Sequence, residues 1–153
     1  MSKKNLLRPY QELEHTHLED VQEYLKEHAD SILSEDRPFS NYMKAMIKQK
    51  HLKQRDVFLW ADVPERYGYK LISEEKRTRQ RDVILRICYA ARFSLEETQE
   101  ALRIYELPQL YEKISRDVVL MLCFRERPGN VNDVNAALEK HGMEMLRTSG
   151  VQE

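Results

Sequence analysis

The spacing of apolar residues predicts short amphipathic helices along the whole chain. Residues three and four positions apart share one face of a helix, so apolar residues at these steps indicate a face that packs on a core. Such steps predict helices over residues 18–33, 41–52, 53–62, 65–73, 82–92, 95–107, 117–127 and 132–141. Only four glycines and five prolines interrupt the 153 residues. Folds rich in β-structure need more turn residues, so the predicted fold class is all-α.

Several predicted helix ends carry residues that favour helix capping. Ser40 is placed to be the N-cap of the helix over residues 41–52. Pro64 stands where a helix can begin, because a missing N–H has no consequence in the first turn. Ser94 and Glu97 have the spacing of a capping box, and Gly142 is placed to end the last helix.

The chain contains an internal repeat. Residues 81–89 match residues 116–124, and after one inserted residue the apolar positions of 95–110 match those of 131–146. The shared positions are mostly apolar, which predicts two helical hairpins that bury the same face. Chance similarity between two amphipathic hairpins is the alternative. The second copy lacks the basic flanking run of the first, so we interpret it as a packing or partner surface.

Positive charge is confined to the centre of the chain. Residues 44–92 carry 13 Lys/Arg and 6 Asp/Glu, a net charge of +7. The segments 1–43 and 93–153 each have a net charge of −4, so the whole chain is close to neutral. A basic segment inside an acidic protein is typical of a module that binds a polyanion. The alternative is a solvated basic face without a partner.

Other function classes find little support in the sequence. No apolar run reaches the roughly 18 residues of a membrane span, and no apolar signal region follows the N-terminus. Cys88 and Cys123 lie in apolar helical patterns, which predicts buried, reduced thiols in a cytoplasmic protein. His15 and His17 lack a third metal ligand nearby. We find no phosphate loop or nucleophile motif, so we expect no enzyme activity, no cofactor and no small-molecule ligand.

The segment 52–83 has the layout of a helix-turn-helix, with two short helices, a tight turn and a basic loop. It resembles, together with the helix that follows, the Xre or lambda-repressor-like transcriptional regulators. The resemblance extends without gaps over residues 52–92 and rests on Leu52, Gln54, Val57, Val63, Tyr67 and Leu71. It implies a five-helix DNA-binding fold over about residues 39–107, in which the second helix of the pair enters the major groove.

The resemblance also implies which residues face double-stranded DNA. Arg66 and Lys70 would point into the groove, where arginine can pair with guanine, and Gln54 would touch the groove edge. Glu65 would accept a hydrogen bond from cytosine or orient Arg66. Tyr69 is a further candidate contact, with partial burial as the alternative. Four basic residues of the following loop would hold phosphates, namely Lys76, Arg77, Arg79 and Arg81.

Four departures from the family pattern bear on whether this segment binds DNA. Phe58 replaces a small residue and Gly68 replaces an apolar one, and Phe58 could fill the space that Gly68 leaves. Asp62 stands where the turn usually has glycine, and it would have to adopt a left-handed backbone conformation. Glu74 and Glu75 add negative charge beside the expected phosphates. Two hypotheses therefore stand, a DNA-binding regulator and a protein-interaction module on the same scaffold that no longer reads DNA.

The expected organisation has three parts. Residues 1–38 form a tail and an acidic helix, residues 39–110 form the DNA-binding domain, and residues 111–153 form an extra C-terminal hairpin. We expect the acidic helix to pack behind the domain, with an autoinhibitory cover over the DNA face as the alternative. One recognition helix covers only a half-site, so we expect a homodimer. Its surface would come from residues 117–145 or from the acidic helix.

Overall fold

The protein is all-helical over the residues that the structure describes, which are 12–30, 32 and 36–148 of a computed structural model. These residues form no strand, which confirms the predicted all-α class. The elements are η1 (Leu18–Asp20), α2 (Val21–Glu27), α3 (Pro38–Gln49), α4 (Gln54–Ala61), α5 (Glu65–Ile72), α6 (Arg81–Ala90), α7 (Leu95–Ile104), α8 (Ser115–Glu126) and α9 (Val131–Lys140). The chain divides into two compact units, residues 1–36 and residues 37–153. The expected tail over residues 1–11 lies outside the described residues.

The first unit contains a shorter helix than the apolar spacing predicts. The helix α2 has seven residues, and the three residues before it form the 3-10 helix η1. Tyr24 is the buried residue of α2, and its ring centroid lies 4.3 Å from that of His28. Leu18, Val21 and Leu25 are exposed. Local apolar spacing was therefore a poor guide to the length of this helix.

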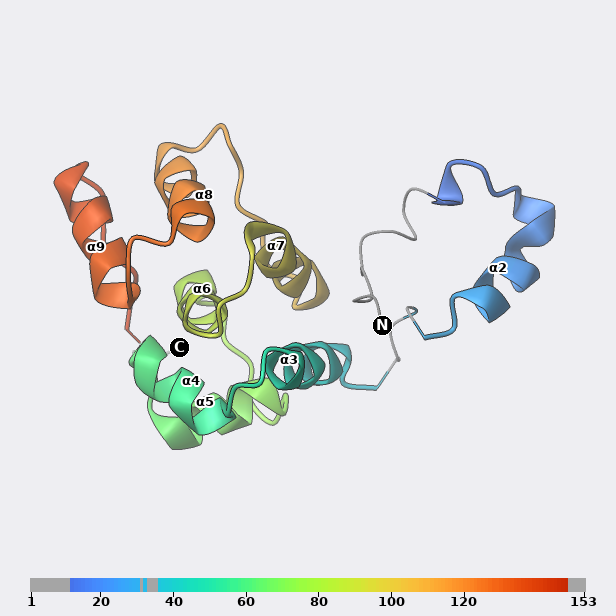
Figure 1. The fold of residues 1–153 in the computed structure, drawn as a ribbon, viewed down its shortest axis with the longest axis horizontal. Coiled ribbons are helices and arrows are strands. Elements are labelled where there is room, and N and C mark those ends of the chain that lie inside the picture. Colours follow the sequence, from blue (N-terminus) through green and yellow to red (C-terminus); the bar gives the residue numbers. More distant parts are fainter. Residues whose placement is uncertain (1–11, 31, 33–35, 149–153) are drawn as a thin grey trace. The chain divides into compact units, whose positions relative to one another are not determined.

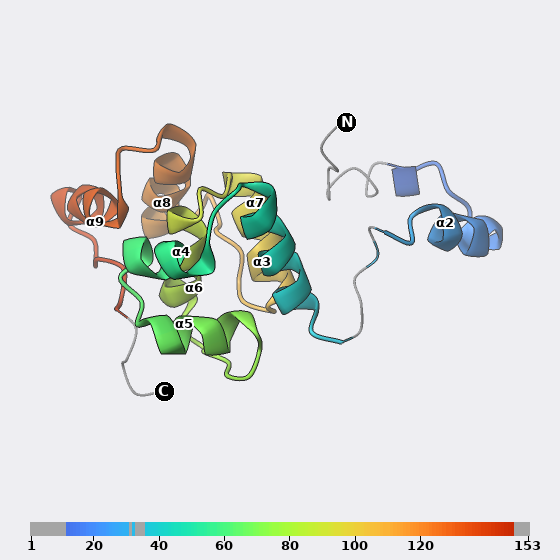
Figure 2. The ribbon, with the colours of Figure 1, turned by 60° about the horizontal axis from the view of Figure 1, so that its bottom comes forward.

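The second unit is built around α6. Every residue from Asp82 to Ala90 is buried, as expected for a helix with apolar residues on several sides. The helix packs against α4, α7 and α9, and both views show it between its neighbours (Figures 1 and 2). The helices α5 and α8 lie at opposite ends of this unit. Residues 111–148 belong to the same compact unit as residues 37–110.

The helix ends follow the sequence signals with one exception. Ser94 and Glu97 form the predicted capping box, and Gly142 follows α9 with a left-handed φ of 73°. Ser40, however, is not an N-cap. The helix α3 begins earlier, at Pro38, because proline suits the first helical turn. The Ser40 amide lies in the first turn and has no acceptor within the helix. It donates to Glu74 Oε2 at 3.0 Å.

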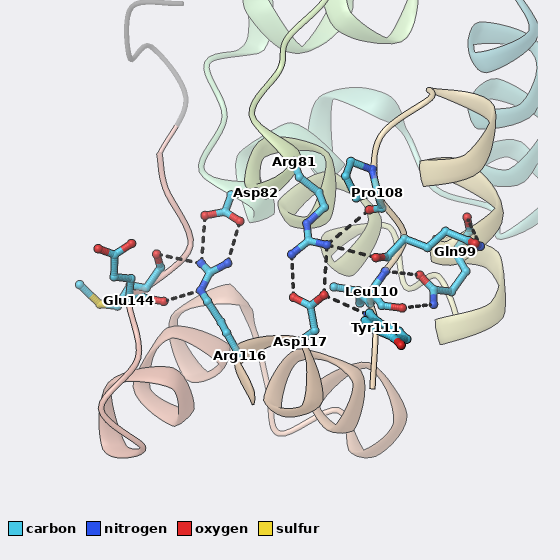
Figure 3. Close-up of polar contacts among 11 residues, drawn as sticks. Arg81, Asp82, Gln99, Pro108, Leu110, Tyr111, Arg116, Asp117 and Glu144 are labelled. Carbon is cyan, nitrogen blue, oxygen red and sulfur yellow. Dashed lines mark hydrogen bonds and ion pairs between the residues drawn. The ribbon is translucent and has the colours of Figure 1, made fainter. Parts of the chain in front are cut away.

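The internal repeat is visible as a pair of reciprocal ion pairs (Figure 3). Arg81, at the start of α6, binds the Asp117 carboxylate at the start of α8 at 2.6 Å. Arg116 on α8 binds the Asp82 carboxylate on α6 at 3.0 Å. Each pair is bidentate. Residue i of one copy contacts residue j of the other and the reverse also holds, which is the pattern of a two-fold relation.

The same relation continues in the extended chain after each hairpin. Both acceptor carboxylates also receive a backbone N–H from the other copy's extended segment, Asp117 from Tyr111 and Asp82 from Arg147. Each arginine also donates to two carbonyl groups of its own copy's extended segment. These matching contacts confirm the predicted repeat and make chance similarity a poor explanation.

Arg86 joins the segment after α9 to the end of α4. Its side chain is buried and donates to the carbonyl oxygens of Ala61, Leu146 and Arg147. Burial lowers the pKa of the guanidinium, while Asp62 and Asp82 oppose that shift. The last described segment is thus joined to the end of α4. The C-terminal hairpin is an integral part of the packed unit.

We predict that Asp117→Ala lowers the free energy of unfolding by about 3 kcal/mol, because it leaves Arg81 without its carboxylate and the Tyr111 amide without its acceptor. Urea unfolding followed by circular dichroism measures this value. Asp82→Ala should have a similar cost, since it removes the equivalent pair. The control Glu139→Ala changes an exposed carboxylate and should stay within about 0.5 kcal/mol. A loss below about 1 kcal/mol for both aspartates would show that the reciprocal pairs contribute little to stability.

Candidate nucleic-acid interface

The turn between α4 and α5 is set by one residue in a left-handed conformation. Asp62 ends α4 with φ 56° and ψ 48°. Its amide donates to Leu59 O, and the Val63 amide donates to Phe58 O at 3.0 Å. Aspartate adopts this conformation more readily than most residues, and the left-handed backbone predicted for Asp62 is confirmed. Val63 is buried and Pro64 precedes α5, so the second helix begins in a fixed direction.

Phe58 and Gly68 hold α4 and α5 at close range. An ideal Cβ on Gly68 would lie 2.5 Å from Phe58 Cδ1, a distance that real Cβ atoms do not show. The Phe58 ring also packs edge-on against Tyr69, with ring centroids 5.0 Å apart. Phe58 is fully buried and fills the space that a side chain at position 68 would need. Phe58 therefore occupies the space left by Gly68, as predicted.

One face of α5 is buried, and another face is exposed. Gly68, Leu71 and Ile72 are buried, whereas Glu65, Arg66 and Tyr69 are exposed. Lys70 is half-buried and lies four residues after Arg66, so both belong to one side of the helix. No ion pair involves Arg66, Lys70 or Glu65 within the described part of the chain, so Glu65 does not orient Arg66. The helix α5 presents a mixed, mainly basic and aromatic outer surface.

The start of α4 lies beside this surface. Gln54 is its first residue and is half-buried. A groove of about 350 Å³ between the two helices is lined by Arg55, Asp56, Leu59, Val63 and Glu65. Arg55 was absent from the set predicted by sequence. Its one available signal was its place in the first turn, next to the predicted contact Gln54.

The predicted phosphate-binding residues in the loop after α5 differ in how freely their side chains are exposed. Lys76 and Arg79 are exposed, and the Lys76 amide donates to Lys70 O at 3.0 Å. Arg77 is half exposed, but its guanidinium lies 4.1 Å from the Tyr105 ring centroid and donates to Tyr105 O. This stacking fixes the direction in which Arg77 presents its remaining N–H groups.

Arg81 has a different role from the one that the resemblance implied. Its guanidinium is largely buried and binds Asp117 together with the carbonyl oxygens of Pro108 and Gln109 (Figure 3). A guanidinium held by a buried carboxylate and two carbonyl groups has few donors left for a phosphate. We therefore leave Arg81 out of the candidate interface. The structure keeps the other predicted residues on or beside the α4–α5 pair and its loop.

The two glutamates of the loop also differ from each other. Glu74 directs one oxygen to the Ser40 amide and the other to Arg77, 3.9 Å from its Nη1. Glu74 therefore contacts both the start of α3 and the basic loop. Glu75 is exposed, and its amide donates to Ser73 Oγ at 3.4 Å. Glu75 is thus the carboxylate left beside the expected phosphates.

Metal-ligand types, apolar helices and cysteines were the other candidate features of the described residues. In the described ranges no three His, Cys, Asp or Glu side chains are arranged to hold a metal, and no helix is long and apolar enough to cross a membrane. Cys88 and Cys123 are free and buried, and burial raises the pKa of both thiols. Trp60, on α4, is 43% exposed, and the Arg92 guanidinium carbon lies 5.9 Å from its ring centroid.

Comparison of the chain with protein-family models, with curated proteins and with solved structures finds no match. The physical properties of the surface described above therefore have to carry any conclusion about function.

The contact between Phe58 and Gly68 predicts strong coupling between these positions. Gly68→Ala alone should lower the free energy of unfolding by about 1–3 kcal/mol, because the new methyl group overlaps the Phe58 ring. In a Phe58→Leu background the same substitution should be close to neutral, since leucine leaves room and alanine favours the helix. Denaturant unfolding of the two single variants and the double variant gives the coupling energy. Additive effects would contradict the proposed compensation.

Proposed function

We propose that this chain is a sequence-specific DNA-binding transcriptional regulator that uses α4 and α5 as a helix-turn-helix. The observation that carries the proposal is the exposure of Glu65, Arg66 and Tyr69 on the outer face of α5, at the end of a short helix pair with a rigid turn. A helix held in this way can enter the major groove while residues around it contact phosphates. We propose further that α3 to α7 together form a lambda-repressor-like domain.

The basic candidate residues and Gln54 have definite roles in this proposal. Arg66 and Lys70 read base edges, where a good bidentate contact discriminates by about 1–3 kcal/mol. Gln54 and Arg55, in the first turn of α4, hold the groove edge. Phosphates are bound by the exposed basic residues of the loop, Lys76, Arg77 and Arg79. These contacts release counterions, so the affinity falls with salt.

The rest of the proposal follows from the same reading. We also propose that the chain acts in the cytoplasm, with no catalytic site and no cofactor. One α5 helix covers only a half-site, so we propose a homodimer, in which each copy contributes one α5 helix.

A protein-interaction module on the same scaffold is the second candidate function. The observation that favours it is the internal use of Arg77 and Arg81, which removes part of the positive charge that the sequence suggested. Glu75 adds an exposed negative charge beside Lys76. A surface with weaker net charge suits a protein partner better than a phosphate backbone.

We expect the purified full-length chain to select one duplex from fragments of its own locus, with an affinity that falls steeply from about 50 to 200 mM salt. Arg66→Ala/Lys70→Ala should weaken binding to the selected duplex by about tenfold or more, because it removes the groove contacts. Arg103→Ala/Lys140→Ala is the matched control, since it removes two positive charges from exposed positions on α7 and α9. Fluorescence anisotropy measures all three proteins.

The outcomes separate the two candidate functions. An equal loss in both double variants would mean that only total charge matters, and sequence reading by α5 would be wrong. No binding by the unaltered chain at about 50 mM salt would favour the interaction module.

A further inference from the structure

The outer face of α8 carries apolar residues that nothing in the second unit covers. Val118 and Leu122 on α8, together with Ile114 at its N-cap, recur every four residues and are 36%, 48% and 49% exposed. The opposite side of α8 carries the buried residues, among them Leu120 and Phe124. A helix with apolar residues on both sides is normally covered on both sides. We call Ile114, Val118 and Leu122 the α8 ridge.

The internal repeat indicates what kind of element fits this ridge. Val118 and Leu122 correspond to Val83 and Ile87 of α6, which are both 0% exposed. The helix α6 packs against α7 and α9, and α8 also packs against α9 and α7. The difference is α4, which packs on α6 and has no counterpart on α8. The face that is open on α8 is therefore the face that a helix covers in the first copy.

We propose that the α8 ridge pairs with the α8 ridge of a second copy of this chain. A row of side chains at four-residue steps is the ridge that interdigitates with a like ridge in the commonest class of helix packing. A two-fold pair of identical ridges meets this requirement with one surface. The inference concerns the assembly of the chain and holds whether or not the α4–α5 pair reads DNA.

The charges at the two ends of α8 favour an antiparallel pair. Glu112 and Lys113 precede the helix, and Arg125 and Glu126 form its last turn. All four are exposed, and none forms an ion pair within the described part of the chain. When two copies of α8 run antiparallel, the start of one lies beside the end of the other. Each Arg125 then faces the partner copy's Glu112, so the surface is complementary to itself.

This pairing has a consequence for the proposed DNA-binding function. The helices α8 and α5 lie at opposite ends of the second unit (Figures 1 and 2). A two-fold contact through α8 therefore places the two α5 helices at the far ends of the dimer. Such a dimer holds two separate DNA segments, in contrast to one that reads adjacent half-sites on a single duplex. This consequence alone rests on the proposed function.

The first experiment is sedimentation equilibrium of the full chain from about 1 to 100 μM. We expect a dimer that Ile114→Glu/Leu122→Glu weakens by at least about 100-fold, because pairing would bury four unpaired carboxylates. Ala45→Glu/Ala136→Glu is the matched control, with two carboxylates on exposed positions of α3 and α9, and should leave the dimer unchanged. Circular dichroism checks that each variant is folded. A monomer over the whole range, or a dimer that survives Ile114→Glu/Leu122→Glu, overturns the proposal.

A charge exchange tests the antiparallel arrangement. Arg125→Glu and Glu112→Arg should each weaken the dimer about tenfold, and the double variant should restore it, because the facing charges are again opposite. Two single losses that add in the double variant would overturn this arrangement.

A capture experiment tests the consequence for DNA. Beads that carry one duplex should retain a second, labelled duplex only when the unaltered chain is present, and Ile114→Glu/Leu122→Glu should bind one duplex without retaining the second. Absence of all DNA binding would reject the proposed function, while the sedimentation result would still decide the α8 pairing. DNA binding by a proven α8 dimer without retention of the second duplex would reject the far-end placement of the α5 helices.

Discussion

The second unit depends on the burial of charge on its central helix. Asp82 and Arg86 lie on α6, where every residue after Arg81 is buried. A buried charge is costly unless it is paired and hydrogen-bonded. Most of the partners of these two residues come from the C-terminal copy of the repeat, through Arg116 and the backbone of residues 146 and 147. The C-terminal hairpin thus completes the packing of the helix that supports α4.

This arrangement links the proposed DNA-reading helix to the far end of the chain. Arg86 joins Ala61, the last residue of α4, to the segment after α9. Asp62, next to Ala61, sets the turn that directs α5. The position of α5 thus depends on contacts from both copies of the repeat. A chain truncated after α7 would keep α3 to α7 but would lose these acceptors.

The basic residues of the central segment have different roles in the structure. The net +7 of residues 44–92 predicted one basic surface. In the structure Arg81 and Arg86 donate hydrogen bonds to groups inside the unit. Arg77 stacks on Tyr105, and Lys50 pairs with Glu97 at 2.8 Å. What remains for a polyanion is a smaller set around α5 and its loop. Charge counts along a sequence therefore overstate the positive surface whenever arginines serve as internal hydrogen-bond donors.

The sequence by itself determined the features that depend on neighbours a few residues apart. These are the all-α class, the α4–turn–α5 pair with its left-handed Asp62, the capping box at Ser94, and the repeat in the pattern of apolar residues. Helical periodicity, capping and turn conformation act over one or two turns, so the sequence displays them. The compensation between Phe58 and Gly68 was also visible, because the two positions face each other across one short turn.

Only the tertiary structure decided which polar groups gain distant partners and which apolar residues remain exposed. The Arg81–Asp117 pair joins residues 36 positions apart, and the Ser40 amide meets Glu74 from another loop. The same reason applies to α8, whose pattern matches α6 but whose outer face lacks a covering helix. Partners of this kind are chosen by packing of distant segments, and no local pattern encodes them.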